Sequence, residues 1–149
     1  MSHLDPSSLS ILRALFGMGL LTLVMAGWMT AVRMPAMKRA GLTLQDAAHT
    51  KALAERLPSS AVRVADNYRH LFEAPVAFYA VALAIIVAGL ADPVYAICAW
   101  GFLGTRILHS ITQATFNRVD VRATLYVLSW IPLAILIIRP IVTLCFAAS

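Results

Sequence analysis

A polar stripe crosses an otherwise apolar stretch of this chain. Arg106, His109 and Gln113 stand at i, i+3 and i+7, so they share one face of a helix. Arg106 lies 14 residues after Asp92 and 12 before Arg118, which is about 21 Å and about 18 Å along a helix. An arginine at that depth in a bilayer is costly and has to face other helices or a wet cavity. Hydrogen bonding between helices is the alternative reading, and it suits Gln113 better than Arg106.

A carboxylate lies at the start of the preceding apolar stretch, at a depth in the membrane similar to that of Arg106. Glu73 lies 19 residues before Asp92, or about 28 Å along a helix, and therefore within about 7 Å of Arg106 in depth. His70 stands at i−3 from Glu73 and shares its helix face. We expect Arg106 and Glu73 to line one common pocket, within or between subunits.

Three further side chains fall at the same level of the chain. Arg122 and Tyr126 are at i and i+4, and Arg33 ends the first apolar stretch. Taken singly, each fits an ordinary membrane boundary, where Arg snorkels and Tyr is interfacial. Together with the residues above, they predict four helices that converge on one polar cavity opening to the cytoplasm.

The elements that position these residues are membrane spans. The chain of 149 residues is 60% hydrophobic and 13% charged, with a mean hydropathy of +0.79. That composition excludes a disordered chain and argues against a soluble domain. We predict an all-α membrane protein, a single four-helix domain over 1–149, because a span needs about 20 apolar residues. The expected spans are about 10–33, 60–90, 94–117 and 121–145.

The basic residues predict the topology. Lys and Arg concentrate in the loop 33–73 and in the turn 118–122, whereas the turn 89–93 carries only Asp92. By the positive-inside rule the first and third loops are cytoplasmic and both termini are on the outer side. The net charge of +5 is then a consequence of topology, and we expect no nucleic-acid partner.

Local signals refine two segments. Thr43 to Asp46 resembles a capping box ahead of a short helix that ends near Leu57. The second span is expected to begin near Ser60 and run without interruption to about Leu90. The two cysteines, Cys98 and Cys145, lie in apolar runs, which predicts buried thiols and no disulfide framework.

A pocket with several Arg and one Glu suits an anionic ligand that also carries an amine, because Arg binds carboxylates bidentately. Glutathione has two carboxylates, one ammonium and a thiol, and composition permits this ligand without selecting it. A nearby Arg and a hydroxyl lower a thiol pKa by stabilising the thiolate. A haem-binding bundle that uses His70 and His109 is an alternative from another class. No metal-binding motif is present, and we expect no metal site.

The residues around the two polar clusters resemble a known family. The stretch Asp66–Pro75, followed by an apolar helix, is similar to the second helix of the MAPEG superfamily, the membrane-associated proteins of eicosanoid and glutathione metabolism. The run from Arg106 through Asn117-Arg118 to Arg122 and Tyr126 resembles its third and fourth helices. The resemblance covers nearly the whole chain and is closest to small bacterial members, which implies a bacterial inner membrane.

The resemblance implies a homotrimer that binds glutathione between neighbouring subunits near the cytoplasmic side. The positions that match the ligand-binding pattern are Arg33, Glu73, Arg106, His109, Arg122 and Tyr126. In that pattern Arg122 is the leading candidate for stabilising the thiolate, with Tyr126 beside it as a second catalytic candidate. Glu73 is the candidate for holding the ligand's amine or for fixing Arg106.

The chain departs from the family pattern at three positions. His70 and Gln113 stand at ligand-binding positions where catalytic members usually have Asn and Tyr, and Asp66 replaces a common Arg. The function that the resemblance implies is a glutathione-dependent membrane transferase or peroxidase. It would act on small hydrophobic electrophiles that arrive from the lipid. The alternative is a non-catalytic protein of the same fold that binds a lipid or another anionic metabolite.

Overall fold

A computed structural model describes residues 4–48 and 50–147, which form helices and no strand. Four helical segments are long and apolar enough to cross a membrane, as the sequence predicts. The elements are α1 (Pro6–Arg39), a 3₁₀ turn η1 (Gln45–Ala48), α2 (Thr50–Arg56), α3 (Ser59–His70), α4 (Ala74–Val87), α5 (Pro93–Ala114) and α6 (Val119–Ala147). With 34 residues, α1 is about 51 Å long and exceeds the thickness of a bilayer core.

The prediction of one uninterrupted helix from Ser60 to Leu90 is wrong. α3 ends at His70, and α4 begins at Ala74 after the break Leu71–Glu73. The physical cause is Pro75, which has no N–H to donate to the Leu71 carbonyl and whose ring clashes with that carbonyl in a continuous helix. The Leu71, Phe72 and Glu73 N–H groups bond three residues back instead of four, which closes α3 with a tight turn.

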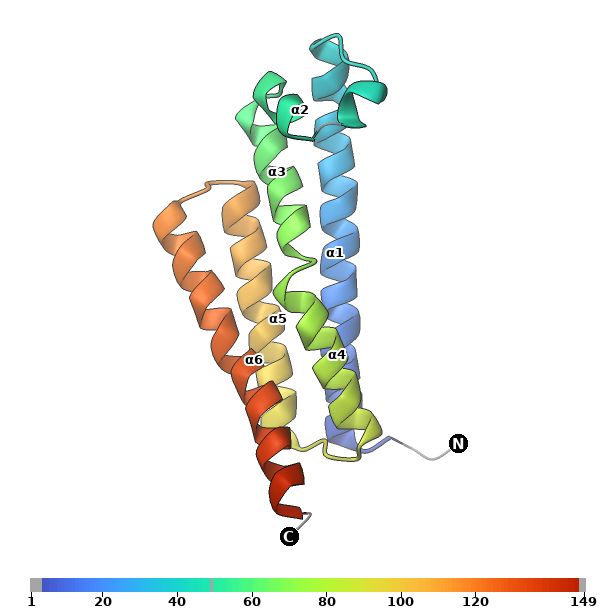
Figure 1. The fold of residues 1–149 in the computed structure, drawn as a ribbon, viewed down its shortest axis with the longest axis vertical. Coiled ribbons are helices and arrows are strands. Elements are labelled where there is room, and N and C mark those ends of the chain that lie inside the picture. The colour runs from blue at the N-terminus through green and yellow to red at the C-terminus, as the bar shows by residue number, and fades with distance from the viewer. Residues whose placement is uncertain (1–3, 49, 148–149) are drawn as a thin grey trace.

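Both termini lie at one end of the bundle, and the long first loop lies at the other (Figure 1). We call the end with the loop 40–58, the break 71–73 and the turn 115–118 the loop half. The end with Asp5, the turn 88–92 and the last turns of α6 is the terminal half. In Figure 1, α5 and α6 lie side by side. The helices α3 and α4 follow α1 one after the other, separated by the break 71–73.

Apolar packing joins the helices along their length. Phe78 of α4 stacks on Phe102 of α5 with ring centroids 4.6 Å apart. α1 approaches α5 closely at Gly17, where an added Cβ would lie 2.7 Å from the Leu103 Cδ2 atom. The core therefore includes residues of α1, α3, α4, α5 and α6, and α5 also carries the polar stripe.

The outer surface is apolar as well. Large exposed side chains cover all four spans, among them Phe16, Val87, Ile97 and Ile131. Apolar surface on this scale marks contact with lipid or with other protein rather than with water. The expectation of two buried thiols holds for Cys98 but is wrong for Cys145, which is exposed on α6 near its end, and both cysteines are free.

The first loop has its own small core. Met37, Leu42 and Leu53 are buried together and tie α2 to the end of α1. Asp46 accepts hydrogen bonds of 2.7 Å from both the hydroxyl and the N–H of Thr43, which is one half of the predicted capping box. These bonds stabilise the carboxylate and hold the pKa of Asp46 below its usual value.

Candidate functional site

At the break between α3 and α4, the His70 carbonyl keeps only a long hydrogen bond of 3.5 Å from the Glu73 N–H. In a continuous helix the His70 carbonyl would accept from the N–H of residue 74. Here Arg106 Nη2 donates to that carbonyl at 2.8 Å, across from α5. Arg106 is 0% exposed, and its Nε and Nη1 atoms have no hydrogen-bond partner among the described residues. Arg106, whose burial costs free energy, therefore caps the end of α3 with one nitrogen. Its other two nitrogens remain without hydrogen-bond partners among the described residues.

Glu73 pairs with its own neighbour rather than with Arg106. The His70 Nδ1 atom lies 3.0 Å from Glu73 Oε2, at the i, i+3 spacing across the break. Both side chains are partly open to the outside. The carboxylate that the sequence matched with Arg106 is thus held at the mouth of the site, while Arg106 lies buried behind it.

A pocket of about 260 Å³ opens at this level of the bundle. Its lining comes from the end of α3, the break, α5 and α6 and consists of His70, Glu73, His109, Arg122, Ala123, Tyr126 and Val127. Glu73 and Arg122 bring the charged groups of this lining, and Ala123 and Val127 bring its apolar side chains. The structure therefore brings five of the predicted site residues to one cavity, although they lie up to 56 positions apart in the chain. They are His70, Glu73, His109, Arg122 and Tyr126.

Aromatic rings connect this pocket to the buried arginine and to the outer surface. The His109 ring contacts the rings of His70 and Tyr126, each at 6.2 Å between centroids. The Arg106 guanidinium carbon lies 5.9 Å from the centre of the Tyr126 ring, within cation–π range. Tyr126 in turn contacts Trp130 at 6.1 Å, and Trp130 is 43% exposed on the outside of α6.

Gln113 lies in the bundle interior and is not among the residues that line the pocket. Its side chain is 1% exposed, and Oε1 has no hydrogen-bond partner in the described chain. The Ser110 hydroxyl and both polar atoms of the Asn67 amide are buried and equally unpaired. An unsatisfied buried polar group costs about 1–3 kcal/mol. The loop half is therefore rich in polar groups able to bind something further.

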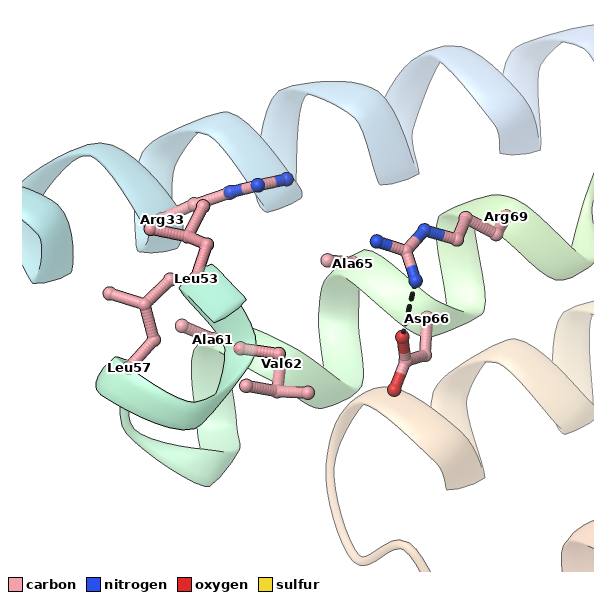
Figure 2. Close-up of a pocket in the computed structure, with 9 residues that line it drawn as sticks. Arg33, Leu53, Leu57, Ala61, Val62, Ala65, Asp66 and Arg69 are labelled. Atoms are coloured by element: carbon pink, nitrogen blue, oxygen red, sulfur yellow. Dashed lines mark hydrogen bonds and ion pairs between the residues drawn. The ribbon is translucent and has the colours of Figure 1, made fainter. Parts of the chain in front are cut away.

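Arg33 lines a different pocket within the subunit. It extends from α1 beside the apolar side chains of Leu53, in α2, and Leu57, just after α2, and Arg69 of α3 lies on the other side (Figure 2). Arg69 is occupied by Asp66, at 3.2 Å, whereas Arg33 has no ion pair or hydrogen bond within the described residues. This second pocket has room for about one water molecule, with a volume of about 10 Å³.

One residue that contacts the site was not predicted as a site residue. Asn117, in the turn between α5 and α6, accepts a hydrogen bond of 2.9 Å from Arg122 Nη1 through its side-chain oxygen. An Asn just after a helix signals a left-handed turn, because its short side chain tolerates that backbone. An Asn at this position therefore predicts the turn, but it does not predict which side chain will bond to the Asn amide.

Among the described residues, no group of three or more His, Cys, Asp and Glu side chains is arranged to hold a metal ion. The polar lining of the pocket instead combines one arginine, two histidines, one tyrosine and one carboxylate. Such a set is chemically suited to an organic anion that carries an amine.

Comparison with known proteins gives one informative match. The model of the MAPEG family matches residues 11–142, which is most of the chain and includes every predicted site residue. No curated protein and no solved structure matches the chain. This match and the four apolar helices point to an integral membrane protein. The chain belongs to the MAPEG family.

Proposed function

We propose that this protein is a glutathione-dependent membrane transferase or peroxidase that acts on small hydrophobic electrophiles. The observation that carries the proposal is the shared pocket, in which Arg122 and Tyr126 lie one helical turn apart and face Glu73. A cationic donor with a hydroxyl beside it can stabilise a thiolate, and the carboxylate can hold an ammonium group. Family membership supports the same assignment.

The chemistry is a nucleophilic attack by the ligand's sulfur. Arg122 stabilises the thiolate, whose proton goes to solvent, and the sulfur forms a bond to the electrophilic atom as the leaving group departs. The electrophile approaches along the apolar Ala123–Val127 wall, which faces the outside of α6. Arg106 and His109 shape the floor of the pocket through the Tyr126 ring.

The assembly is part of the proposal. We place glutathione between the subunits of a homotrimer, with Arg33 of a neighbouring subunit contributing a donor, because Arg33 has no ion pair or hydrogen bond among the described residues of its own chain. The loop half faces the cytoplasm, since Lys and Arg concentrate in its loops. The setting is a bacterial inner membrane.

A second candidate is a non-catalytic MAPEG protein that binds a lipid or another anionic metabolite. The pairing of Glu73 with His70 favours it, because a carboxylate already held at 3.0 Å is less available to a ligand's amine. The two candidates differ in whether a thiol reacts in the pocket.

Calorimetric titration of the detergent-purified protein with glutathione tests the proposal. We expect saturable binding, and a matched titration with S-methylglutathione separates the contribution of the thiolate from that of the carboxylates. No binding at millimolar glutathione contradicts the proposal. Turnover of a chlorinated aromatic substrate or an organic hydroperoxide above the uncatalysed rate excludes the non-catalytic candidate.

A further inference from the structure

Asn117 has an unusual backbone conformation. Its φ angle is 49°, and it is the only residue other than glycine with a positive φ among the described residues. Residues other than glycine rarely adopt this left-handed backbone conformation, and Asn is one of the few that tolerate it. Such conformations persist where the surrounding structure requires them and gather at functional sites.

The surrounding turn shows what this conformation achieves. The Asn117 N–H donates to the Thr112 carbonyl at 2.7 Å and closes the end of α5, and α6 begins two residues later at Val119. The left-handed residue therefore reverses the chain within a few positions. The same geometry brings the Asn117 amide oxygen to 2.9 Å from Arg122 Nη1, in a partly buried contact.

The charges of the turn are distributed in a way that leaves Arg122 free. Asp120 is the carboxylate nearest in sequence, and it pairs with Arg118 at 3.0 Å. Within the described residues, no carboxylate forms an ion pair with Arg122. Its partner is the neutral amide of Asn117, which fixes one N–H and leaves the positive charge and the remaining donors for the pocket.

We propose that Asn117 is a positioning residue, which holds the Arg122 guanidinium toward the pocket through a neutral hydrogen bond. The proposal rests on the proposed function, in which Arg122 stabilises the thiolate. A long arginine side chain has many rotamers, and one fixed hydrogen bond selects the rotamer that points at the ligand. A neutral acceptor does this without cancelling the charge that the thiolate needs.

The test separates the turn from the amide. Asn117→Gly keeps a residue that accepts positive φ and removes only the acceptor, so the turn is retained. We expect the wild type to bind glutathione as a thiolate, visible by its ultraviolet absorbance. In the variant, the pH profile of thiolate formation shifts to higher pH, and kcat/KM falls about tenfold, the effect of one lost hydrogen bond.

A second measurement does not depend on glutathione. Phenylglyoxal labels arginine side chains, and mass spectrometry of the full-length protein gives the labelling rate at Arg122. We expect several-fold faster labelling in Asn117→Gly. Asn117→Asp, which keeps an acceptor oxygen, should retain slow labelling but form less thiolate because its charge opposes it. Arg118→Gln, which breaks the neighbouring ion pair, is the matched control and should change neither readout.

The two measurements distinguish the two proposals. If the wild type binds no glutathione but Asn117→Gly still accelerates labelling of Arg122, the proposed function fails and the positioning role stands. If the wild type forms the thiolate and Asn117→Gly changes neither its pH profile nor the labelling, the positioning role is overturned. A thiolate shift without a change in labelling also overturns it, because Asn117 would then act by another route.

Discussion

The two halves of the bundle treat their polar side chains in opposite ways. In the terminal half, Asp92 accepts from the Tyr95 N–H at 3.0 Å and pairs with Arg139 at 2.6 Å. The Arg139 guanidinium also lies 4.5 Å from the centre of the Tyr95 ring. Asp5 caps α1 through the N–H groups of Ser7 and Ser8. Both carboxylates of this half therefore have partners, and both lie at helix ends.

The loop half leaves its polar groups partly unused. Arg106 has one hydrogen bond and two unpaired nitrogens, although it is fully buried. Gln113, Ser110 and Asn67 are buried with unpaired atoms as well. A fold that only needed stability would pair such groups or replace them with apolar side chains. The difference supports the proposal that the loop half binds a ligand, while the pairs of the terminal half join its helices.

The largest expected effect is on turnover in the loop half. Arg122→Ala should lower glutathione conjugation by about 100-fold, the typical loss for one preorganised donor to a developing charge. Its melting temperature should stay close to that of the wild type, because Arg122 is half-buried and has one hydrogen bond. Steady-state kinetics and thermal unfolding of the same detergent sample measure both. If Arg122→Ala loses stability in proportion to activity, the contrast between a binding loop half and a stabilising terminal half is wrong.

The reverse pattern is expected in the terminal half. Arg139→Ala should lower the free energy of unfolding by about 1.5–3 kcal/mol, the range for a hydrogen bond to a charged group, and leave turnover unchanged. Arg139→Lys, which keeps the charge, is the matched control and should lose less. Equilibrium unfolding of the detergent-solubilised protein measures the change, and a fall in turnover with intact folding contradicts the assignment.

The same pair predicts a pH dependence. Burial raises the pKa of Asp92, but the Tyr95 N–H and the Arg139 guanidinium outweigh it, so the pKa lies below the ordinary value of 3.8. The folded state then favours the carboxylate. This contribution to stability is fully present above pH 3.8 and is lost as the pH falls through the lower value of the folded state. Arg139→Ala should flatten unfolding profiles in that acidic range.

A smaller effect is expected where the break meets the site. Pro75→Ala supplies an N–H that can bond to the Leu71 carbonyl, so the helix can continue and the His70 carbonyl is taken by its own helix. Arg106 then loses its partner, and affinity for glutathione should fall about fivefold, equal to about 1 kcal/mol. Hydrogen exchange at residues 71–75 should slow. Unchanged exchange would show that Pro75 does not maintain the break.

The smallest effect is expected at a peripheral contact. Trp100 Nε1 donates to the Ser10 hydroxyl at 3.1 Å and links α5 to α1 at an exposed position. Ser10→Ala should destabilise the protein by about 0.6 kcal/mol, the average for a hydrogen bond in a membrane protein, without a change in kinetics. Thermal unfolding measures it, with Ser7→Ala as a control, since the backbone of Ser7 makes the cap. A loss comparable to that of Arg139→Ala would contradict this ranking.

Much of the candidate site could be predicted from helical periodicity. The spacing of Arg106, His109 and Gln113 placed them on one face, and the structure buries all three. The level of Glu73 relative to Arg106, and of His70 with it, was predicted by counting residues from Asp92, because a helix rises by a constant distance per residue. The position of Arg33 could not be predicted in this way, since its neighbours come from the first loop.

The sequence by itself determined the four apolar spans, the family and the level of the polar residues along the bundle, because hydrophobicity and helical rise are local properties. Only the tertiary structure decided the partners. Arg106 bonds to the His70 carbonyl at the break before Pro75, and Arg122 bonds to an amide that a left-handed turn presents. Both bonds depend on where the backbone departs from a regular helix, and a pattern of side-chain types does not record that departure.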